Sequence, residues 1–363
     1  MKNLSVYIHI PFCEKKCAYC GFVSFACKAK SVDRYIDALC AEIEDFDSNG
    51  YVVDSIFIGG GTPTFLTDSQ FERIVDCVKS HFVLDLKEFT IEGNPNSYTQ
   101  SKINLYKKLG VTRLSVGVQS LNDKVLSGIG RIHNAKQALQ CLEMLQSSGL
   151  DINCDMMVGL PYQTLDIVKE DMQKIVDFGV NSVSCYSLIL EEGTSLFESV
   201  QKGNMSVPSD DEAVDMYDVA VEILQKAGLE RYEISNFGKK CLHNIGYWTL
   251  KEYIGFGLSA HSLIGNTRFY NTSDFEEYLQ KSARQVEAVL SLEDMQKEYV
   301  MLTLRMESGV DTACFIQKFG KSALDNLLVT IEKDKKYYNI TSANIAIKSE
   351  YIYLSNSLIA NLI

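Results

Sequence analysis

Three cysteines near the start of the chain have the spacing of a metal-ligand set. Cys13, Cys17 and Cys20 form a Cys-x3-Cys-x2-Cys pattern directly after an alternating apolar run, residues 4–10, which predicts a β-strand. Four thiolates hold a cubane iron–sulfur cluster in ferredoxins, so a set of three would leave one iron open to a non-protein ligand. The same three cysteines could instead form a closed zinc site together with a histidine. They could also be buried thiols that bind no metal. The spacing alone leaves these interpretations open.

The rest of the chain alternates strand-like and helix-like segments that would position this loop. Apolar runs predict strands at residues 4–10, 54–58, 88–92, 113–119, 151–158 and 181–188. Amphipathic stretches between them predict helices near residues 31–46, 68–82, 99–109, 135–147, 165–178 and 209–227. Strand–helix units in succession predict a parallel sheet with helices outside it, so the expected fold class is α/β.

Polar or glycine-rich groups follow the predicted strands at their carboxyl ends. They are residues 59–63, with three consecutive glycines, then residues 92–95, Gln119, Asp155 ahead of residues 159–161, and Tyr186 with Ser187. In barrels of parallel strands the chemistry collects at this end of the strands. Three glycines would let the backbone approach a ligand closely, with N–H and C=O groups free to meet it, although a tight turn is the alternative. We therefore expect this rim, with the cysteine loop, to form the active site.

The pattern changes after Gly228. Short motifs rich in tyrosine, glycine and histidine are followed by helical segments and by an apolar run at residues 351–354, which predicts a final strand. This change predicts a second, α+β module. We expect a core domain at residues 1–230 and a smaller C-terminal domain at residues 231–363.

Bulk properties narrow the classes of partner. The 363 residues carry a formal net charge of −12, whereas a surface that tracks phosphates is usually basic, so we expect no nucleic-acid partner. No stretch approaches the ~20 apolar residues that a membrane-spanning helix needs. The first residues lack the apolar core of a signal peptide, which predicts a cytoplasmic protein with reduced thiols. Most cysteines outside the motif are expected to be buried: Cys27, Cys40, Cys77, Cys141, Cys154, Cys185, Cys241 and Cys314.

Several motifs together resemble the oxygen-independent coproporphyrinogen III oxidase-like branch of the radical S-adenosylmethionine (SAM) superfamily. They are Tyr7-x-His-Ile-Pro-Phe-Cys13, Gly59-Gly-Gly-Thr-Pro-Thr64, Gly117-Val-Gln-Ser120, Gly130-Arg-x-His133, Asp155-Met-Met-Val-Gly-Leu-Pro161 and Tyr232-Glu-Ile-Ser-Asn-Phe237. The match covers nearly the whole chain. The resemblance implies a partial (β/α)6 barrel followed by a smaller α+β C-terminal module, which agrees with the units counted above.

The resemblance also implies a role for each matched residue. Cys13, Cys17 and Cys20 would hold a [4Fe–4S] cluster whose open iron is chelated by the amino and carboxylate groups of SAM. Arg131 would pair with the SAM carboxylate, a task suited to a guanidinium group. The other implied contacts are Tyr7 and Tyr19 beside the cluster and SAM, Gly60, Gly61 and Thr62 at the methionine end, Gln119 and Asp155 at the ribose hydroxyls, Glu92 at a polar part of SAM, and Ser187 by its backbone near the adenine.

Two departures from the oxidases point to one subgroup of this branch. The oxidases carry a further cysteine two residues after the third ligand, where this chain has Phe22, and an N-terminal extension, whereas few residues precede Tyr7 here. Both features, and the motif His243-Asn-Ile-Gly-Tyr247-Trp248, resemble the HemW-type subgroup of heme chaperones. The resemblance implies a protein that binds heme and passes it to a client hemoprotein, with peripheral contact where the client is membrane-bound.

A histidine is the expected heme ligand, because imidazole is a standard axial ligand of heme iron. His243 is the first candidate and His261 is its rival, whereas His9, inside the first strand, is expected to be structural. Two other functions stay open at this stage. One is the oxygen-independent coproporphyrinogen III oxidase itself, which carries out an oxidative decarboxylation in porphyrin biosynthesis. The other is a zinc-stabilised α/β binding protein.

Overall fold

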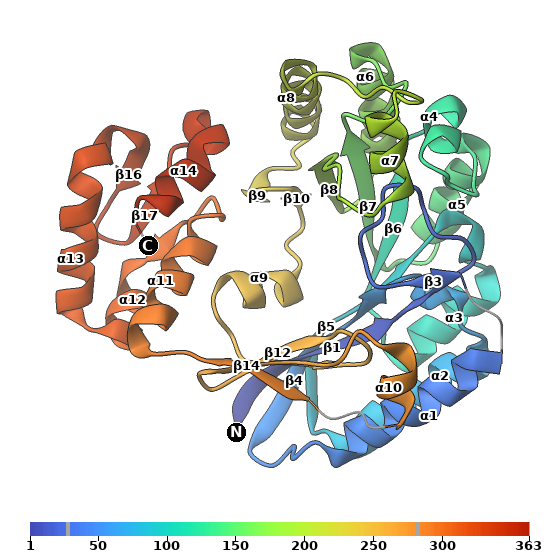
Figure 1. The fold of residues 1–363 in the computed structure, drawn as a ribbon, viewed down its shortest axis with the longest axis horizontal. Coiled ribbons are helices and arrows are strands. Elements are labelled where there is room, and N and C mark those ends of the chain that lie inside the picture. Colours follow the sequence, from blue (N-terminus) through green and yellow to red (C-terminus); the bar gives the residue numbers. More distant parts are fainter. Residues whose placement is uncertain (27–29, 281–283, 363) are drawn as a thin grey trace.

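The computed structural model describes residues 1–26, 30–280 and 284–362. Its framework is a twelve-stranded sheet (Figure 1). The predicted strands are its parallel centre and neighbour one another in chain order: β1 (Lys2–Ile10), β4 (Tyr51–Gly60), β5 (Leu84–Gly93), β6 (Arg113–Gln119), β7 (Asp151–Val158) and β8 (Ser182–Ser187). Within the described residues the two end strands of the sheet do not pair. The α/β class and the partial, open barrel are therefore confirmed.

Amphipathic helices cover the outer side of the parallel strands (Figure 1). The predicted helices are α1 (Lys30–Asp45), α2 (Asp68–His81), α3 (Gln100–Leu109), α5 (Ala135–Gln146), α6 (Leu165–Asp177) and α8 (Asp210–Lys226). Two short helices that we did not anticipate, α4 (Asp123–Gly128) and α7 (Ser195–Gln201), follow β6 and β8. Apolar side chains between strands and helices form the main core, in which Leu4, Ile8 and Tyr35 have no exposed surface.

Local sequence signals set the ends of several of these helices. Thr67 and Gln70 form a capping box at the start of α2, and Ser209 and Glu212 form another at the start of α8, as predicted. Gly110 ends α3 with a φ of 94°, a left-handed conformation that suits glycine. These ends fix the length of the loops that return the chain to the sheet.

Residues 231–289 extend the sheet at both edges. At one edge β11 (Tyr253–Phe256) pairs in parallel with β1, and β12 (His261–Ile264), β13 (Thr267–Tyr270) and β14 (Gln285–Val289) follow in antiparallel order. At the other edge β10 (Asn236–Gly238) pairs with β8, and β9 (Arg231–Glu233) pairs with β10. Between these edges the chain forms α9 (Leu242–Trp248), which contacts β4 and β5. The helix α10 (Phe275–Gln280) packs on α1.

The chain after β14 forms a C-terminal module, drawn in orange and red in Figure 1. It contains α11 (Leu292–Thr303), β15 (Val310–Asp311), α12 (Thr312–Phe319), α13 (Lys321–Ile331), η3 (Glu332–Tyr337), β16 (Tyr338–Ile340), β17 (Asn344–Ile347), η4 (Ser349–Leu354) and α14 (Ser355–Ala360). The strand predicted at residues 351–354 is wrong, because this run lies in the 3₁₀ helix η4 and the last strand is β17. The consecutive exposed residues Tyr353 and Leu354 explain the difference, since a half-buried strand would expose only every second side chain.

The sheet crosses the division that we predicted at residue 230. The strands β9 to β14 belong to the same sheet as the parallel strands. A second hydrophobic core lies mainly in the module, and most of its members follow Leu290. We therefore propose that the core domain extends to about residue 290 and that the smaller module follows it.

Two further expectations concern helices and thiols. Among the described residues, none of the helices combines the length and the apolar character needed to cross a bilayer. Cys314 is half-buried, and Cys27 lies outside the described residues. The other thiols outside the motif are free and buried, as predicted: Cys40, Cys77, Cys141, Cys154, Cys185 and Cys241.

Candidate active site

The cysteine loop leaves the carboxyl end of β1 and is closed by a short parallel pair, β2 (Phe12–Cys13) and β3 (Phe25–Ala26). The Phe25 N–H donates to the Pro11 carbonyl at 2.8 Å, which holds the two ends of the loop together. In the middle of the loop, the Ala18 N–H donates to the Ile129 carbonyl at 3.0 Å, and the Ala18 carbonyl accepts from the Leu196 N–H at 2.8 Å. The loop is therefore fixed to the rim of the barrel at its ends and at its centre.

A chain of hydrogen bonds joins two of the predicted cluster ligands. The Thr62 hydroxyl donates to the Cys13 sulfur at 3.5 Å and accepts from Asn94 Nδ2 at 3.0 Å. Arg131 donates through Nη2 to Asn94 Oδ1 at 2.7 Å and through Nη1 to the Cys17 sulfur at 3.4 Å. Thr62 and Asn94 follow β4 and β5, and Arg131 lies in the loop between α4 and α5, so separate parts of the barrel rim orient the two thiols.

The donor set of this rim fits a three-thiolate cluster with an anionic co-ligand. In the described part of the chain, no group of three or more His, Cys, Asp or Glu side chains is placed around a single metal ion. A cubane instead needs each thiolate on a different iron. The Arg131 Nε is buried and has no hydrogen-bond partner among these residues, so it can still receive a carboxylate. Burial raises the pKa of the Cys13 and Cys20 thiols, so ligation must displace their protons.

Close packing requires the glycines that follow β4. Gly60 has a φ of 105°, and a Cβ there would lie 2.5 Å from the imidazole ring of His9. A Cβ on Gly61 would lie 2.7 Å from the Phe12 carbonyl oxygen. A tight turn is therefore sufficient to explain the three consecutive glycines.

The backbone donors of the same segment are already engaged. The Gly60 N–H donates to Glu92 Oε2 at 3.1 Å, the Gly61 N–H donates to Ile10 at 2.8 Å, and the Thr62 N–H donates to Phe12 at 2.8 Å. We expected free N–H groups here, and these bonds correct that expectation.

Glu92 and Asp155 bring two carboxyl groups to the barrel rim. Burial, together with the charge of Asp155, raises the pKa of Glu92 to about 7. Burial also raises the pKa of Asp155, although Ser115 and Asn153 donate to its carboxylate at 3.1 and 2.7 Å. Near neutral pH, Glu92 can therefore either donate or accept a hydrogen bond.

Gln119 and Ser187 lie at the carboxyl ends of β6 and β8, as predicted. Gln119 has a φ of 69°, and the pairing of β6 with β7 shifts between Gly117 and Gln119. Such backbone strain in a residue with a side chain is often found at functional sites. Ser187 is exposed and pairs with Val158. The contacts of both residues with SAM stay predictions.

The two tyrosines predicted beside the cluster are both half-buried, and burial raises the pKa of each. His9 Nε2 donates to the Val23 carbonyl at 2.9 Å, so its Nδ1 accepts from the Tyr7 hydroxyl, also at 2.9 Å. Both nitrogens of His9 are thus engaged within the protein, in agreement with a structural role. Tyr19 lies within the cysteine loop, between Cys17 and Cys20.

His243 lies inside the protein with both ring nitrogens in hydrogen bonds. Its Nδ1 pairs with the Ser55 hydroxyl at 3.1 Å and its Nε2 with the Tyr247 hydroxyl at 2.8 Å. The residue is 1% exposed, and burial, together with the charge of Lys251, lowers the pKa of its imidazole to about 3. Ligation of iron by His243 would require one of these two hydrogen bonds to break.

Comparisons with known proteins identify the family. Residues 7–175 match the model of the radical SAM superfamily. The chain is 36% identical to the heme chaperone HemW of Bacillus subtilis over 346 residues, which cover 91% of this chain and 90% of that protein. It is 32% identical to the heme chaperone HemW of Mycobacterium tuberculosis, over 85% of this chain and 83% of the relative. The chain belongs to the HemW family of radical SAM proteins.

A solved structure supports the same fold for this HemW-family chain. Coproporphyrinogen III oxidase (HemN) from Escherichia coli superposes with a TM-score of 0.87, over 99% of this chain and 90% of that chain, at 22% sequence identity. At this identity the likeness establishes the fold only. Membership of the radical SAM superfamily implies a [4Fe–4S] cluster and SAM.

Sequence reasoning missed one residue of the HemW-family rim. The sequence marks Asn94 only as part of the segment after β5, whereas its amide connects Thr62 with Arg131. The signal was present in the Glu92-Gly-Asn-Pro95 segment at the end of a strand. Its partners are distant in sequence, so only the fold reveals the connection.

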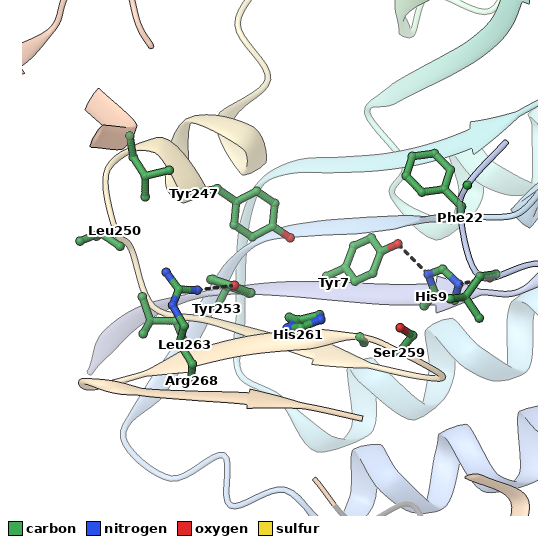
Figure 2. Close-up of a pocket in the computed structure, with 14 residues that line it drawn as sticks. Tyr7, His9, Phe22, Tyr247, Leu250, Tyr253, Ser259, His261, Leu263 and Arg268 are labelled. Carbon is green, nitrogen blue, oxygen red and sulfur yellow. Dashed lines mark hydrogen bonds between the residues drawn. The ribbon is translucent and has the colours of Figure 1, made fainter. Parts of the chain in front are cut away.

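A cavity of about 520 Å³ lies beside this rim, over the part of the sheet formed by β1 and by β11 to β13 (Figure 2). Tyr7 and His9 of β1 line one part of it, and His261 of β12 lines another. The residues Gly21–Val23 of the cysteine loop also belong to its wall. The cavity is thus continuous with the loop that carries the predicted cluster ligands.

Proposed function

We propose that this chain is a heme chaperone, which binds heme and passes it to a client hemoprotein. The supporting observation is its similarity to proteins named heme chaperone HemW over about nine-tenths of its length. The fold is consistent with this proposal but does not select it, because the coproporphyrinogen oxidase shares that fold.

In this proposal Cys13, Cys17 and Cys20 hold the cluster, and Arg131 pairs with the carboxylate of SAM. A reduced cluster, when bound, supplies an electron for the cleavage of SAM. Thr62 and Asn94 keep the Cys13 sulfur and the guanidinium group in place through the hydrogen bonds described above. Glu92, Gln119 and Asp155 offer polar groups at the rim to the remainder of SAM.

The residue at position 22 differs between this chain and the oxidases, and this difference favours the chaperone function. Phe22 occupies the position at which the oxidases carry their further cysteine, and its side chain is 68% exposed at the cavity. A phenyl ring supplies neither a thiol nor a proton. It offers an apolar face, which suits the binding of a macrocycle better than its conversion.

The test is a titration of the full, anaerobically reconstituted protein with hemin, followed by mixing with apomyoglobin. We expect about one heme bound per chain and a transfer to apomyoglobin that is faster than the release of heme into buffer. The same preparation, supplied with coproporphyrinogen III, SAM and dithionite, should form no protoporphyrinogen. Formation of protoporphyrinogen, or failure to bind hemin, would reject the chaperone assignment.

We further propose that the protein acts in the cytoplasm and contacts membrane-bound clients peripherally. The described residues form no helix that could cross a bilayer. Co-sedimentation with vesicles of neutral and anionic lipid, in the presence and absence of a membrane hemoprotein, distinguishes contact with the client from contact with lipid.

A further inference from the structure

The cavity beside the cysteine loop has the size and lining of a ligand site. Its volume of about 520 Å³ falls within the range of roughly 300–1,000 Å³ that is usual for small-molecule pockets. Aromatic and aliphatic side chains dominate the lining, as Figure 2 shows. They include Tyr7, Phe22, Tyr247, Tyr253, Leu263 and Leu302. The members come from β1, the cysteine loop, α9, β11, β12 and α11, so the site forms only in the complete fold.

One imidazole in this lining has the environment of a metal ligand. His261 begins β12 and is exposed to the cavity, and its Nδ1 lies 3.3 Å from Glu287 Oε2 on β14. A carboxylate on Nδ1 favours the tautomer in which Nε2 carries the lone pair, as in histidines that ligate metals. No hydrogen bond to His261 Nε2 is present among the described residues. This nitrogen is therefore available to an incoming metal.

The other histidine of the lining, His9, and the histidine of the family motif, His243, have no ring nitrogen that is free of hydrogen bonds with protein groups. His81 and His133 do not line the cavity. Among the histidines of the described chain, His261 alone combines a place in the cavity with an uncommitted nitrogen.

A cation lies near the imidazole and can receive a carboxylate. Arg268 of β13 binds Glu298 through Nη2 at 2.6 Å, and its Nη1 lies 3.5 Å from the Tyr253 hydroxyl at the cavity wall (Figure 2). The longer contact is the weaker one, so Nη1 can exchange it for a carboxylate oxygen. The combination of an imidazole, a flat apolar wall and a guanidinium group matches the iron, the ring and a propionate of heme.

We propose that this cavity is the heme site, with His261 Nε2 as the axial ligand and Arg268 as the partner of one propionate. The proposal rests on the chaperone function above and adds the location and the ligands. Ligation is a lone-pair donation by neutral imidazole, so the Nδ1 proton stays on the Glu287 hydrogen bond and no electron is exchanged. Glu287 acts as a positioning residue. Phe22 brings the cysteine loop against the bound ring.

The test compares the wild-type holo-protein with His261→Ala, Glu287→Gln and, as a matched control, His81→Ala. Hemin is titrated into each, and the position of the Soret band is recorded with the dissociation constant. His261→Ala should lose the wild-type band and bind hemin at least about ten-fold more weakly, and added imidazole should restore the band. Glu287→Gln should weaken binding by about ten-fold and shift the band. His81→Ala should behave as wild type, and unchanged iron content would show that the His261→Ala protein is folded.

The propionate contact has its own probe, the dimethyl ester of hemin. The wild-type protein should bind the ester more weakly than hemin, and Arg268→Gln should remove the difference. A His261→Ala protein with the wild-type band and affinity would overturn the site but leave the chaperone function intact. Loss of the band in His243→Ala, with retention in His261→Ala, would also overturn it. A wild-type protein that binds no hemin would instead overturn the function itself.

Discussion

At the scale of single residues, Asn94 is the group that connects the two sides of the cluster rim. It donates to Thr62, which faces Cys13, and it accepts from Arg131, which faces Cys17. Replacing Asn94 by Ala removes both bonds and leaves the guanidinium group without one of its acceptors. We expect SAM to bind about ten-fold more weakly, as is usual when a group behind a ligand is lost.

Equilibrium binding of SAM to the reconstituted protein, together with iron counting, measures this effect. Asn104→Ala is the matched control, because Asn104 is exposed on α3 and only accepts from Gln100. Equal affinities for SAM in the two variants would show that the hydrogen-bonded chain does not orient Arg131.

Glu92 predicts a pH dependence of stability. Its pKa is about 7 in the folded protein, above the ordinary value of 4.5, so the folded state holds a proton that the unfolded state has lost between these pH values. The free energy of unfolding should therefore fall as pH rises from about 4.5 to about 7, by roughly 1.4 kcal/mol for each pH unit in this interval. In Glu92→Gln this contribution is absent.

Urea unfolding of the cluster-free wild type and of Glu92→Gln, at intervals from pH 5 to pH 8, isolates that contribution as the difference between the two curves. The variant should gain stability relative to wild type as pH rises. A difference that does not vary with pH would mean that Glu92 is ionised throughout.

At the scale of elements, a buried carboxylate holds the start of α9. Glu88, which is 5% exposed, accepts from the Leu242 N–H at 2.8 Å, the His243 N–H at 3.1 Å and the Cys241 thiol at 3.2 Å. Glu88→Gln turns one acceptor into a donor and removes the charge that favours a helix N-terminus. We expect a loss of about 1–3 kcal/mol in the free energy of unfolding.

Urea unfolding measures this loss, with Asp85→Asn on the same strand as the control, because Asp85 is exposed. The control should change stability by no more than about 0.5 kcal/mol. Since α9 carries Tyr247 to the cavity wall, Glu88→Gln should also weaken hemin binding. Equal stabilities of the two variants would remove Glu88 from this role.

Some elements of the fold could be predicted from the sequence and others could not. Apolar runs were sufficient to predict the parallel strands, of which β4 and β6 are buried on both faces, and a period of 3.6 residues was sufficient for the helices, which bury one face. The sequence also predicted that the residues at the strand ends lie at one rim, since parallel strands bring their carboxyl ends to one edge of the sheet. The sequence did not predict the sheet extensions after Gly228, because the short strands that attach them, β10 and β11, pair with β8 and β1, which are distant in the sequence. For the same reason the sequence could not show that both nitrogens of His243 are engaged.

At the scale of the whole molecule, the C-terminal module is tied to the edge of the sheet at β9. Arg231, whose side chain is 6% exposed, pairs with Glu307 at 2.5 Å, and the Glu307 N–H donates to the Tyr232 carbonyl at 3.1 Å. Tyr353 also donates to Asp218 of α8. Glu307→Gln leaves a mostly buried guanidinium group without its carboxylate, which should cost about 1–3 kcal/mol and loosen the module.

Limited proteolysis should then cut Glu307→Gln faster than wild type after residue 290. Hemin affinity should fall as well, because Leu302 of the module lines the cavity. Glu293→Gln provides the control, since its pair with Lys297 is on the surface. Identical cleavage of all three proteins would show that the module is held by its apolar contacts alone.

The central strand β1 has a consequence for how the molecule opens. Its backbone pairs with β4 along its whole length and with β11 over part of it, and Leu4, Val6 and Ile8 have no exposed surface. Amide protons in such a position exchange with solvent only when the entire domain unfolds. The cysteine loop begins from this strand, so fluctuations that loosen the outer strands would leave the attachment of this loop undisturbed.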